Sequence, residues 1–260
     1  MPLDDLGPDT ELQIMPRYLA GPGSADFQTA WPFPFEEGWS LHRPDAGHRI
    51  ASSPCLRVQT GFLPDPDNPS SGTWTTALQK PFGQPQWRAT FTGAAPLELL
   101  RDFHTELLSL YLADEDNVED YLLDADTPAL VGYMPLLMED WSHTVRKDGK
   151  QVFHSPDNLA ALWHWYTERP QGSWVFQAGI PDQPPVWKAT FTAGTPVPLI
   201  SAFTSSLVED EPLTRTVRDI PIATRDFLYF PEGLPTRAAS PQPPPKPAAP
   251  PPALPTSRSR

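Results

Sequence analysis

Two stretches of sequence, 100 residues apart, decide the fold: WRATFTGAAPLELLRDFHTELL (residues 87–108) and WKATFTAGTPVPLISAFTSSLV (residues 187–208). Each begins with tryptophan, and the phenylalanine, proline and leucine positions behind it coincide. Similarity at a fixed spacing indicates an internal repeat. Two shorter matches lie upstream at a spacing of 102 residues, Trp39-Ser40 with Trp141-Ser142 and Ser53-Pro54 with Ser155-Pro156. The sequence therefore predicts a tandem duplication.

The second stretch indicates how each repeat folds. Trp187, Ala189 and Phe191 alternate with polar residues, which is the period-two pattern of a strand with one buried face. Pro196 suits the first turn of a following helix, and apolar residues recur behind it at helical spacing. Aromatic-rich segments upstream add further strands. We therefore predict an α+β fold of two tandem repeats, each an antiparallel sheet of about four strands followed by one amphipathic helix.

Composition divides the chain further. Between the repeats, residues 113–126 hold seven carboxylates and no basic residue, which is typical of a solvated connector. Nine of the fifteen residues from 241 to 255 are proline, so this part cannot build a core. The predicted segments are a first repeat (11–112), an acidic linker (113–127), a second repeat (128–210), an extension (211–236) and a disordered proline-rich tail (237–260). The tail is either a tether, a docking segment or simply a disordered terminus.

Charge and hydropathy limit the class of protein. The chain has 260 residues, a formal net charge of −13 and one cysteine. We find no apolar run near the ~18 residues that a membrane span needs, and no basic and apolar leader of a secreted protein. A cytoplasmic protein without membrane association is expected. The acidic balance disfavours nucleic acid as a partner and suits a basic protein.

The order of several landmarks resembles a known family. Pro16-Arg17-Tyr18-Leu19-Ala20-Gly21 is followed by Gly38-Trp39, Ser53-Pro54 and the strand from Trp87. This order is similar to the actinobacterial domain of unknown function 317, the SPDY-motif family, over roughly residues 15–210. The resemblance implies tandem copies of the domain and implies no established activity or cofactor.

The Ser-Pro motif is the first candidate site. Ser155-Pro156-Asp157-Asn158 keeps three of the four motif residues, whereas the first copy continues as Cys55-Leu56. Asp157 and Asn158 could bind a ligand. The same residue types end strands and close turns through side-chain hydrogen bonds to the backbone, and we favour that interpretation.

A hairpin supplies a weaker candidate. A two-residue turn at Asp148-Gly149 would place His143 opposite His154, where two imidazoles could contribute to a metal site. A zinc site needs three or four ligands, so cross-strand packing explains the pair equally well. No metal is therefore expected.

Aromatic residues on one predicted strand form the third candidate. Trp163 and Trp165 share one face, whereas His164 and Tyr166 share the other. One face must meet the helix, and the other is either covered by the second copy or forms an exposed platform for stacking bases.

No catalytic constellation is evident. The sequence lacks a G-x-S-x-G elbow, a phosphate-binding loop and any thiol-enzyme signature around Cys55. We therefore expect a non-catalytic protein, without cofactor, whose two repeats pack side by side through aromatic sheet faces or helices and present a composite surface to a protein partner. The alternative is single- or double-stranded nucleic-acid binding through an exposed aromatic sheet face. The sequence does not indicate the partner or the oligomeric state.

Overall fold

The fold is taken from a computed structural model. It describes residues 3–23, 27–44, 47–65, 67, 72–80, 83–116, 120–123, 126–166 and 173–231. The predicted tail (237–260) lies outside the described residues, as do part of the acidic linker and the last residues of the predicted extension.

Ten strands form one antiparallel sheet. Their order across the sheet is β2 (Ser40–His42), β3 (Arg49–Ser52), β4 (Val58–Pro64), β5 (Gly72–Leu78), β6 (Trp87–Thr92), β11 (Trp187–Phe191), β10 (Trp174–Ala178), β9 (Ala160–His164), β8 (Gln151–His154) and β7 (Ser142–Val145). The first half of the chain supplies five strands and the second half supplies five, in mirrored order. Each half thus has one strand more than the expected four or so.

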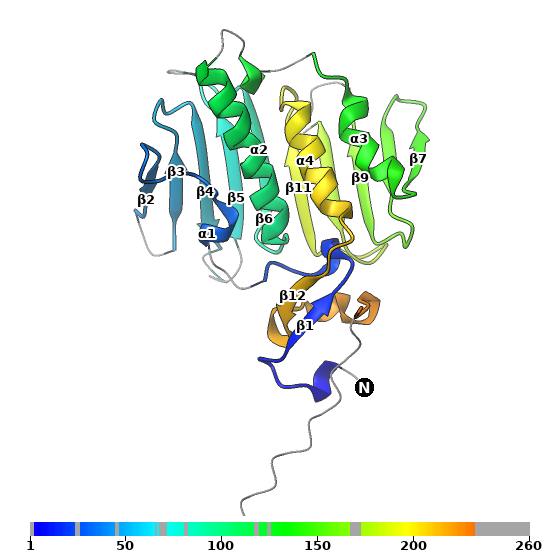
Figure 1. Ribbon diagram of the computed structural model, residues 1–260. Coiled ribbons are helices and arrows are strands. Elements are labelled where there is room, and N and C mark those ends of the chain that lie inside the picture. The colour runs from blue at the N-terminus through cyan, green and yellow to red at the C-terminus, as the bar shows by residue number, and fades with distance from the viewer. Residues whose placement is uncertain are drawn as a thin grey trace, which may run out of the picture.

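Helices cover one face of this sheet. They are α1 (Phe27–Ala30), α2 (Leu97–Asp116), α3 (Ala129–Met138) and α4 (Val197–Val208). In Figure 1, α2 and α4 lie side by side across the middle of the sheet, with α3 beside α4. The predicted helix of each repeat is present as α2 and α4. The helix α3 was not expected, because its sequence ALVGYMPLLM is apolar on every side and contains Gly132 and Pro135.

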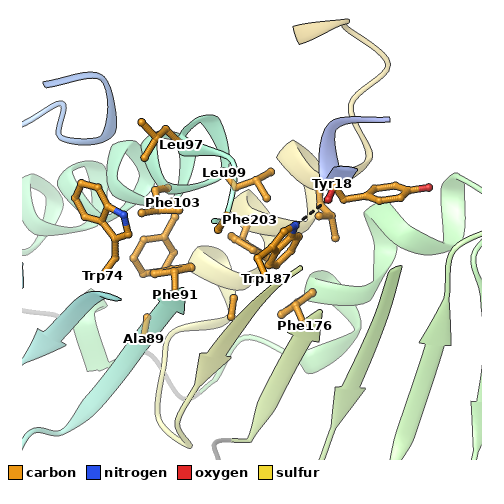
Figure 2. Close-up of a cluster of buried hydrophobic side chains, with 14 of the residues drawn as sticks. Tyr18, Trp74, Ala89, Phe91, Leu97, Leu99, Phe103, Phe176, Trp187 and Phe203 are labelled. Atoms are coloured by element: carbon orange, nitrogen blue, oxygen red, sulfur yellow. Dashed lines mark hydrogen bonds between the residues drawn. The ribbon is translucent and has the colours of Figure 1, made fainter. Parts of the chain in front are cut away.

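The two halves join edge to edge through β6 and β11. Phe91 on β6 and Phe191 on β11 have ring centroids 5.5 Å apart, and both rings contact Phe203 on α4. Figure 2 shows Phe91 and Phe103 beneath α2, close to Phe203, and Phe176 lies further along the sheet. The copies therefore do not pack through aromatic sheet faces; they share one sheet and one core, and α2 contacts α4 above it.

A second, two-stranded sheet lies below the first (Figure 1). It pairs β1 (Glu11–Ile14) with β12 (Leu213–Thr216), so the start of the predicted first repeat meets the residues that follow the second. The remaining described elements are short 3-10 helices; they are η1 (Leu3–Asp5), η2 (Arg17–Leu19), η3 (Tyr121–Leu123), η4 (Val217–Asp219) and η5 (Ile222–Phe227).

The repeated tryptophans occupy matching places. Trp87 and Trp187 are each 1% exposed, and each indole N–H donates to a backbone carbonyl. Trp87 donates to the carbonyl of Leu122 of η3 at 2.8 Å. Trp187 donates to the carbonyl of Tyr18 of η2 at 2.8 Å, as Figure 2 shows. The segment before β2 thus covers Trp187 of the second half, and the segment before β7 covers Trp87 of the first half.

Candidate functional site

The Ser-Pro motif of the second half forms a closed turn before β9. The Ser155 hydroxyl oxygen accepts the backbone N–H groups of Leu159 and Ala160 at 3.1 and 2.9 Å. The Asp157 carboxylate accepts the Ser155 hydroxyl at 2.6 Å and the Leu159 N–H at 3.0 Å. Asn158 has a φ of 61°, the left-handed conformation that Asn tolerates. The Ser155 and Asp157 side chains are therefore used to shape the turn.

A tyrosine from the N-terminal segment completes this turn. The Tyr18 phenol donates to the second oxygen of Asp157 at 2.7 Å, and its ring meets Trp141 edge to face. Burial, followed by the hydrogen bond and negative charge of Asp157, raises the pKa of Tyr18 well above its ordinary value. Tyr18 is thus held as a neutral hydrogen-bond donor.

The first half builds the same corner from different residues. The Tyr111 phenol of α2 donates to Cys55 Sγ at 3.5 Å, and its ring meets Trp39 edge to face. Burial raises the pKa of the Cys55 thiol, but hydrogen bonds, mainly with Ser53 and Tyr111, outweigh it and hold that pKa below its ordinary value. α4 ends at Val208, before the position equivalent to Tyr111, so η2 supplies the tyrosine in the second half.

A small pocket of about 240 Å³ opens beside Asn158. Trp163, His154 and Gln177 line it from three neighbouring strands. Asp157 does not line it. The pocket therefore joins two of the five predicted binding residues, Asn158 and Trp163.

The aromatic residues of β9 lie on two faces. Trp163 and Trp165 lie on the sheet face opposite the helices, where Lys150 Nζ lies 5.3 Å from the Trp163 ring and 4.4 Å from the Trp165 ring. Tyr166 lies on the helix side, 66% exposed, with its ring 4.7 Å from that of His164. The structure thus separates Tyr166 from the two tryptophans.

The predicted pairing of His143 with His154 is wrong. His143 pairs with Phe153, and Ser142 pairs with His154. The hairpin has a three-residue loop: Gly149, with a φ of 79°, donates to Arg146, and Arg146 donates to Lys150. This loop shifts the register by one residue, which turns the two imidazoles to opposite faces of the sheet.

His143 makes aromatic and polar contacts of its own in place of that pair. His143 stacks on Phe153 and lies 2.8 Å from Gln151 Oε1 through its Nε2 atom. Among the described residues, no group of three or more His, Cys, Asp or Glu side chains is placed to hold a metal ion.

Two histidines, His104 and His164, are buried, and their polar contacts were not predicted from the sequence. His104 of α2 contacts the carbonyl of Ala30 through Nδ1 at 2.7 Å and the Thr76 hydroxyl through Nε2 at 2.8 Å. His164 contacts the Tyr133 phenol and stacks on Trp174. Burial lowers the pKa of His104 and of His164 to about 4. Both are enclosed in the core, so they act as neutral packing groups rather than as accessible bases.

A groove lies between α3 and α4. This groove has a volume of about 710 Å³. Large apolar side chains of α3 form one wall, among them Val131, Met134 and Met138. Small residues of α4 form the facing wall, which leaves the space open; they are Ser201, Ala202 and Ser205.

Carboxylates surround this groove. Its lining includes Asp102 of α2, Glu139 after α3, and Glu209 and Asp210 after α4, and no basic residue is among the described residues that line it. Glu209 pairs with the buried Arg17 at 2.7 Å, and Asp102 accepts the Ser206 hydroxyl at 2.5 Å. Sequence reasoning missed the groove, although the unbroken apolar run of α3 is a signal that points to it.

Comparison with known families finds a match in each half of the chain. The model of the SPDY family, a domain of unknown function (DUF317), matches residues 52–113 and 154–213. Two regions of the chain thus match the SPDY domain, which supports two tandem copies. It matches no curated protein and no solved structure.

Each SPDY match covers the same elements. The first runs from the end of β3 through the Ser-Pro turn, β4, β5 and β6 into α2, and the second runs from the end of β8 through β9, β10 and β11 past α4. The helix α3 lies before the second SPDY match. None of the described helices is long and apolar enough to cross a membrane.

Proposed function

We propose that the protein is a non-catalytic interaction protein that binds a basic amphipathic helix of a protein partner in the groove between α3 and α4. The observation that carries this proposal is the exposed apolar surface of α3, bordered by carboxylates. We also infer that the two SPDY units arose by duplication, and that the proline-rich tail is an adjoining tether.

The exposed methionine side chains of α3 support a binding role for the groove. Met138 is 73% exposed and Met134 is 43% exposed, and both line the groove. Contiguous apolar surface on a folded protein marks an interaction site, and methionine adapts its shape to different partners. The apolar wall of α3 therefore suits the apolar face of a partner helix.

The border of the groove selects the charge of that partner. Glu139 and Asp210 are exposed at the ends of α3 and α4. Basic side chains on the flanks of a partner helix would meet these carboxylates, which speeds encounter and fixes orientation more than it adds affinity. An acidic helix would be repelled.

The groove draws on both copies of the domain. Asp102 comes from α2 of the first copy, and its Oδ2 atom holds the Ser206 hydroxyl of α4 in the second. This contact fixes the helix positions on either side of the border. A composite surface of this kind requires the tandem arrangement.

A peptide titration tests the proposal. We expect a basic amphipathic peptide of about three helical turns to bind the full chain in fluorescence anisotropy, and an acidic peptide of the same apolar pattern to fail. Met134→Glu places a charge in the groove and should weaken binding by about tenfold or more. Leu130→Glu changes another exposed residue of α3 that does not line the groove, so it should leave binding unchanged. Absence of binding at low salt, or equal loss in both variants, would refute the proposal.

A further inference from the structure

The ten-stranded sheet lacks acidic residues within its strands. Its strands contain no aspartate and no glutamate, although the chain has 32 acidic residues. Trp87, Ala89 and Phe91 of β6 are buried on the helix side, so the alternate residues lie on the other side, here named the outer face. The outer face thus lacks strand carboxylates in an acidic protein.

Cations and hydroxyls occupy the middle of the outer face. Thr90 pairs with Thr190. Arg88 precedes Thr90 by two residues on β6, and Lys188 precedes Thr190 by two residues on β11. Because the strands are antiparallel, the two cations lie on opposite sides of the threonine pair. The Arg88 N–H donates to the Thr192 hydroxyl oxygen at 2.7 Å, which fixes the backbone at that position. Arg88 is exposed and Lys188 is partly exposed. The two charges come from equivalent positions of the two copies.

An aromatic and cationic cluster lies further along the same face. Trp163 and Trp165 are partly exposed, with the Lys150 ammonium between 4 and 6 Å from both ring centres. β6 and β9 are separated by three strand spacings, or roughly 14 Å. A single strand of nucleic acid of a few nucleotides bridges that distance.

We propose that the outer face binds single-stranded nucleic acid. Arg88 and Lys188 contact phosphates, and the exposed parts of Trp163 and Trp165 stack bases, which is the combination by which sheet surfaces hold single strands without sequence preference. A basic protein partner does not fit this face, because its charges would meet the same sign. The groove between α3 and α4 is a separate surface on the helix side.

Acidic groups at the border restrict the affinity. Asp182 lines the pocket beside Trp163, and Asp148 lies at the tip of the β7–β8 hairpin. The net charge of −13 further opposes a polyanion. Binding should therefore be weak and fall steeply with salt, because phosphate contacts release counterions.

Fluorescence anisotropy with a labelled oligothymidine of about ten nucleotides tests this inference. The full chain should bind at low salt and release the oligonucleotide at physiological salt. The double variant Arg88→Ala/Lys188→Ala and the single variant Trp165→Ala should each weaken binding by about tenfold. Arg101→Ala removes an exposed cation of α2 on the helix side and should change nothing.

Two results would overturn the inference. One is no binding at low salt by a chain that circular dichroism shows to be folded. The other is equal binding of poly-glutamate with no effect of Trp165→Ala, which would indicate an acidic protein surface as the occupant. Met134→Glu, which tests the groove, should leave oligonucleotide binding intact, so the two proposals fail independently.

Discussion

Thr90 faces Thr190 across the central pair of strands, β6 and β11. The two residues hold the same position in the two copies, so an approximate two-fold axis passes between them, perpendicular to the sheet. Ala89 opposite Phe191 and Phe91 opposite Ala189 obey the same symmetry. This is the geometry of an isologous interface, in which one patch meets a copy of itself. The two halves of the chain thus have the arrangement of a symmetric dimer whose subunits are joined in one chain.

This shared centre predicts one cooperative unfolding unit. Phe91 and Phe191 are fully buried in a cluster with Phe103 and Phe203. Phe91→Ala and Phe191→Ala should each lower the free energy of unfolding by about 3–5 kcal/mol, because each leaves a cavity that both halves line. Urea denaturation followed by tryptophan fluorescence and by circular dichroism should give one coincident transition. The exposed Lys147→Ala, at the tip of the β7–β8 hairpin, serves as the control, and separate transitions for the two halves would argue against a common core.

Acid should destabilise the fold through two histidines. The pKa of His104 and that of His164 are about 4 in the folded chain, below the ordinary 6.5. The unfolded chain therefore binds protons first as the pH falls, so the stabilisation is complete above pH 6.5 and is lost progressively between pH 6.5 and 4. Each histidine contributes about 3 kcal/mol to this loss. Denaturation at several pH values measures the slope, and His104→Asn should flatten it. An unchanged slope in the double variant with His164→Asn would contradict this assignment.

Much of this architecture could be predicted from the sequence, but the way in which the two halves join could not. Alternation around Trp187 and the helical spacing of Leu199, Phe203 and Leu207 indicate the strand β11 and the helix α4, because each pattern has one buried side. Nothing in either pattern states which strand edge meets the other copy. That choice depends on contacts between residues 100 positions apart, such as Phe91 with Phe191.

The candidate sites were less predictable for local reasons. The register of His143 depends on whether the hairpin loop has two residues or three, and Asp148-Gly149 is compatible with both. The groove depends on α3, whose apolar sequence lacks the periodicity that reveals a surface helix. The turn at Ser155 was easier to predict than the hairpin register or the groove, because Ser, Asp and Asn side chains form hydrogen bonds with nearby backbone groups.

The N-terminal tyrosine should stabilise the second copy more than its counterpart stabilises the first. Tyr18→Phe removes a hydrogen bond to the Asp157 carboxylate and should cost about 1–2 kcal/mol. Tyr111→Phe removes the contact with Cys55 Sγ, a weak acceptor, and should cost less than about 1 kcal/mol. Chemical denaturation of the two variants makes the comparison. A Tyr18→Phe variant as stable as the parent would show that the bond adds nothing.

A buried arginine should anchor the small sheet to the large one. Arg215 of β12 forms a two-pronged pair with Glu98 of α2, at 2.8 and 2.6 Å, and also donates to the Gly21 carbonyl at 3.2 Å. Arg215→Ala leaves the partly buried Glu98 carboxylate without this partner and should cost about 3–5 kcal/mol. Arg215→Lys keeps the positive charge but loses the paired hydrogen bonds of the guanidinium, so its stability should lie between that of the parent and that of Arg215→Ala. Thermal unfolding measures both variants, and equal stability of Arg215→Ala and the parent would refute the anchoring role.

Methionine methyl signals test the proposed groove most directly. Met134 and Met138 line it, whereas Met15 is buried and its sulfur accepts the Tyr229 phenol at 2.8 Å. In a chain labelled at the methionine methyl carbons, titration with the basic amphipathic peptide should shift the signals of Met134 and Met138 and leave that of Met15 in place. Equal shifts at all three, or a bound peptide with no shift at Met134 and Met138, would contradict binding in the groove.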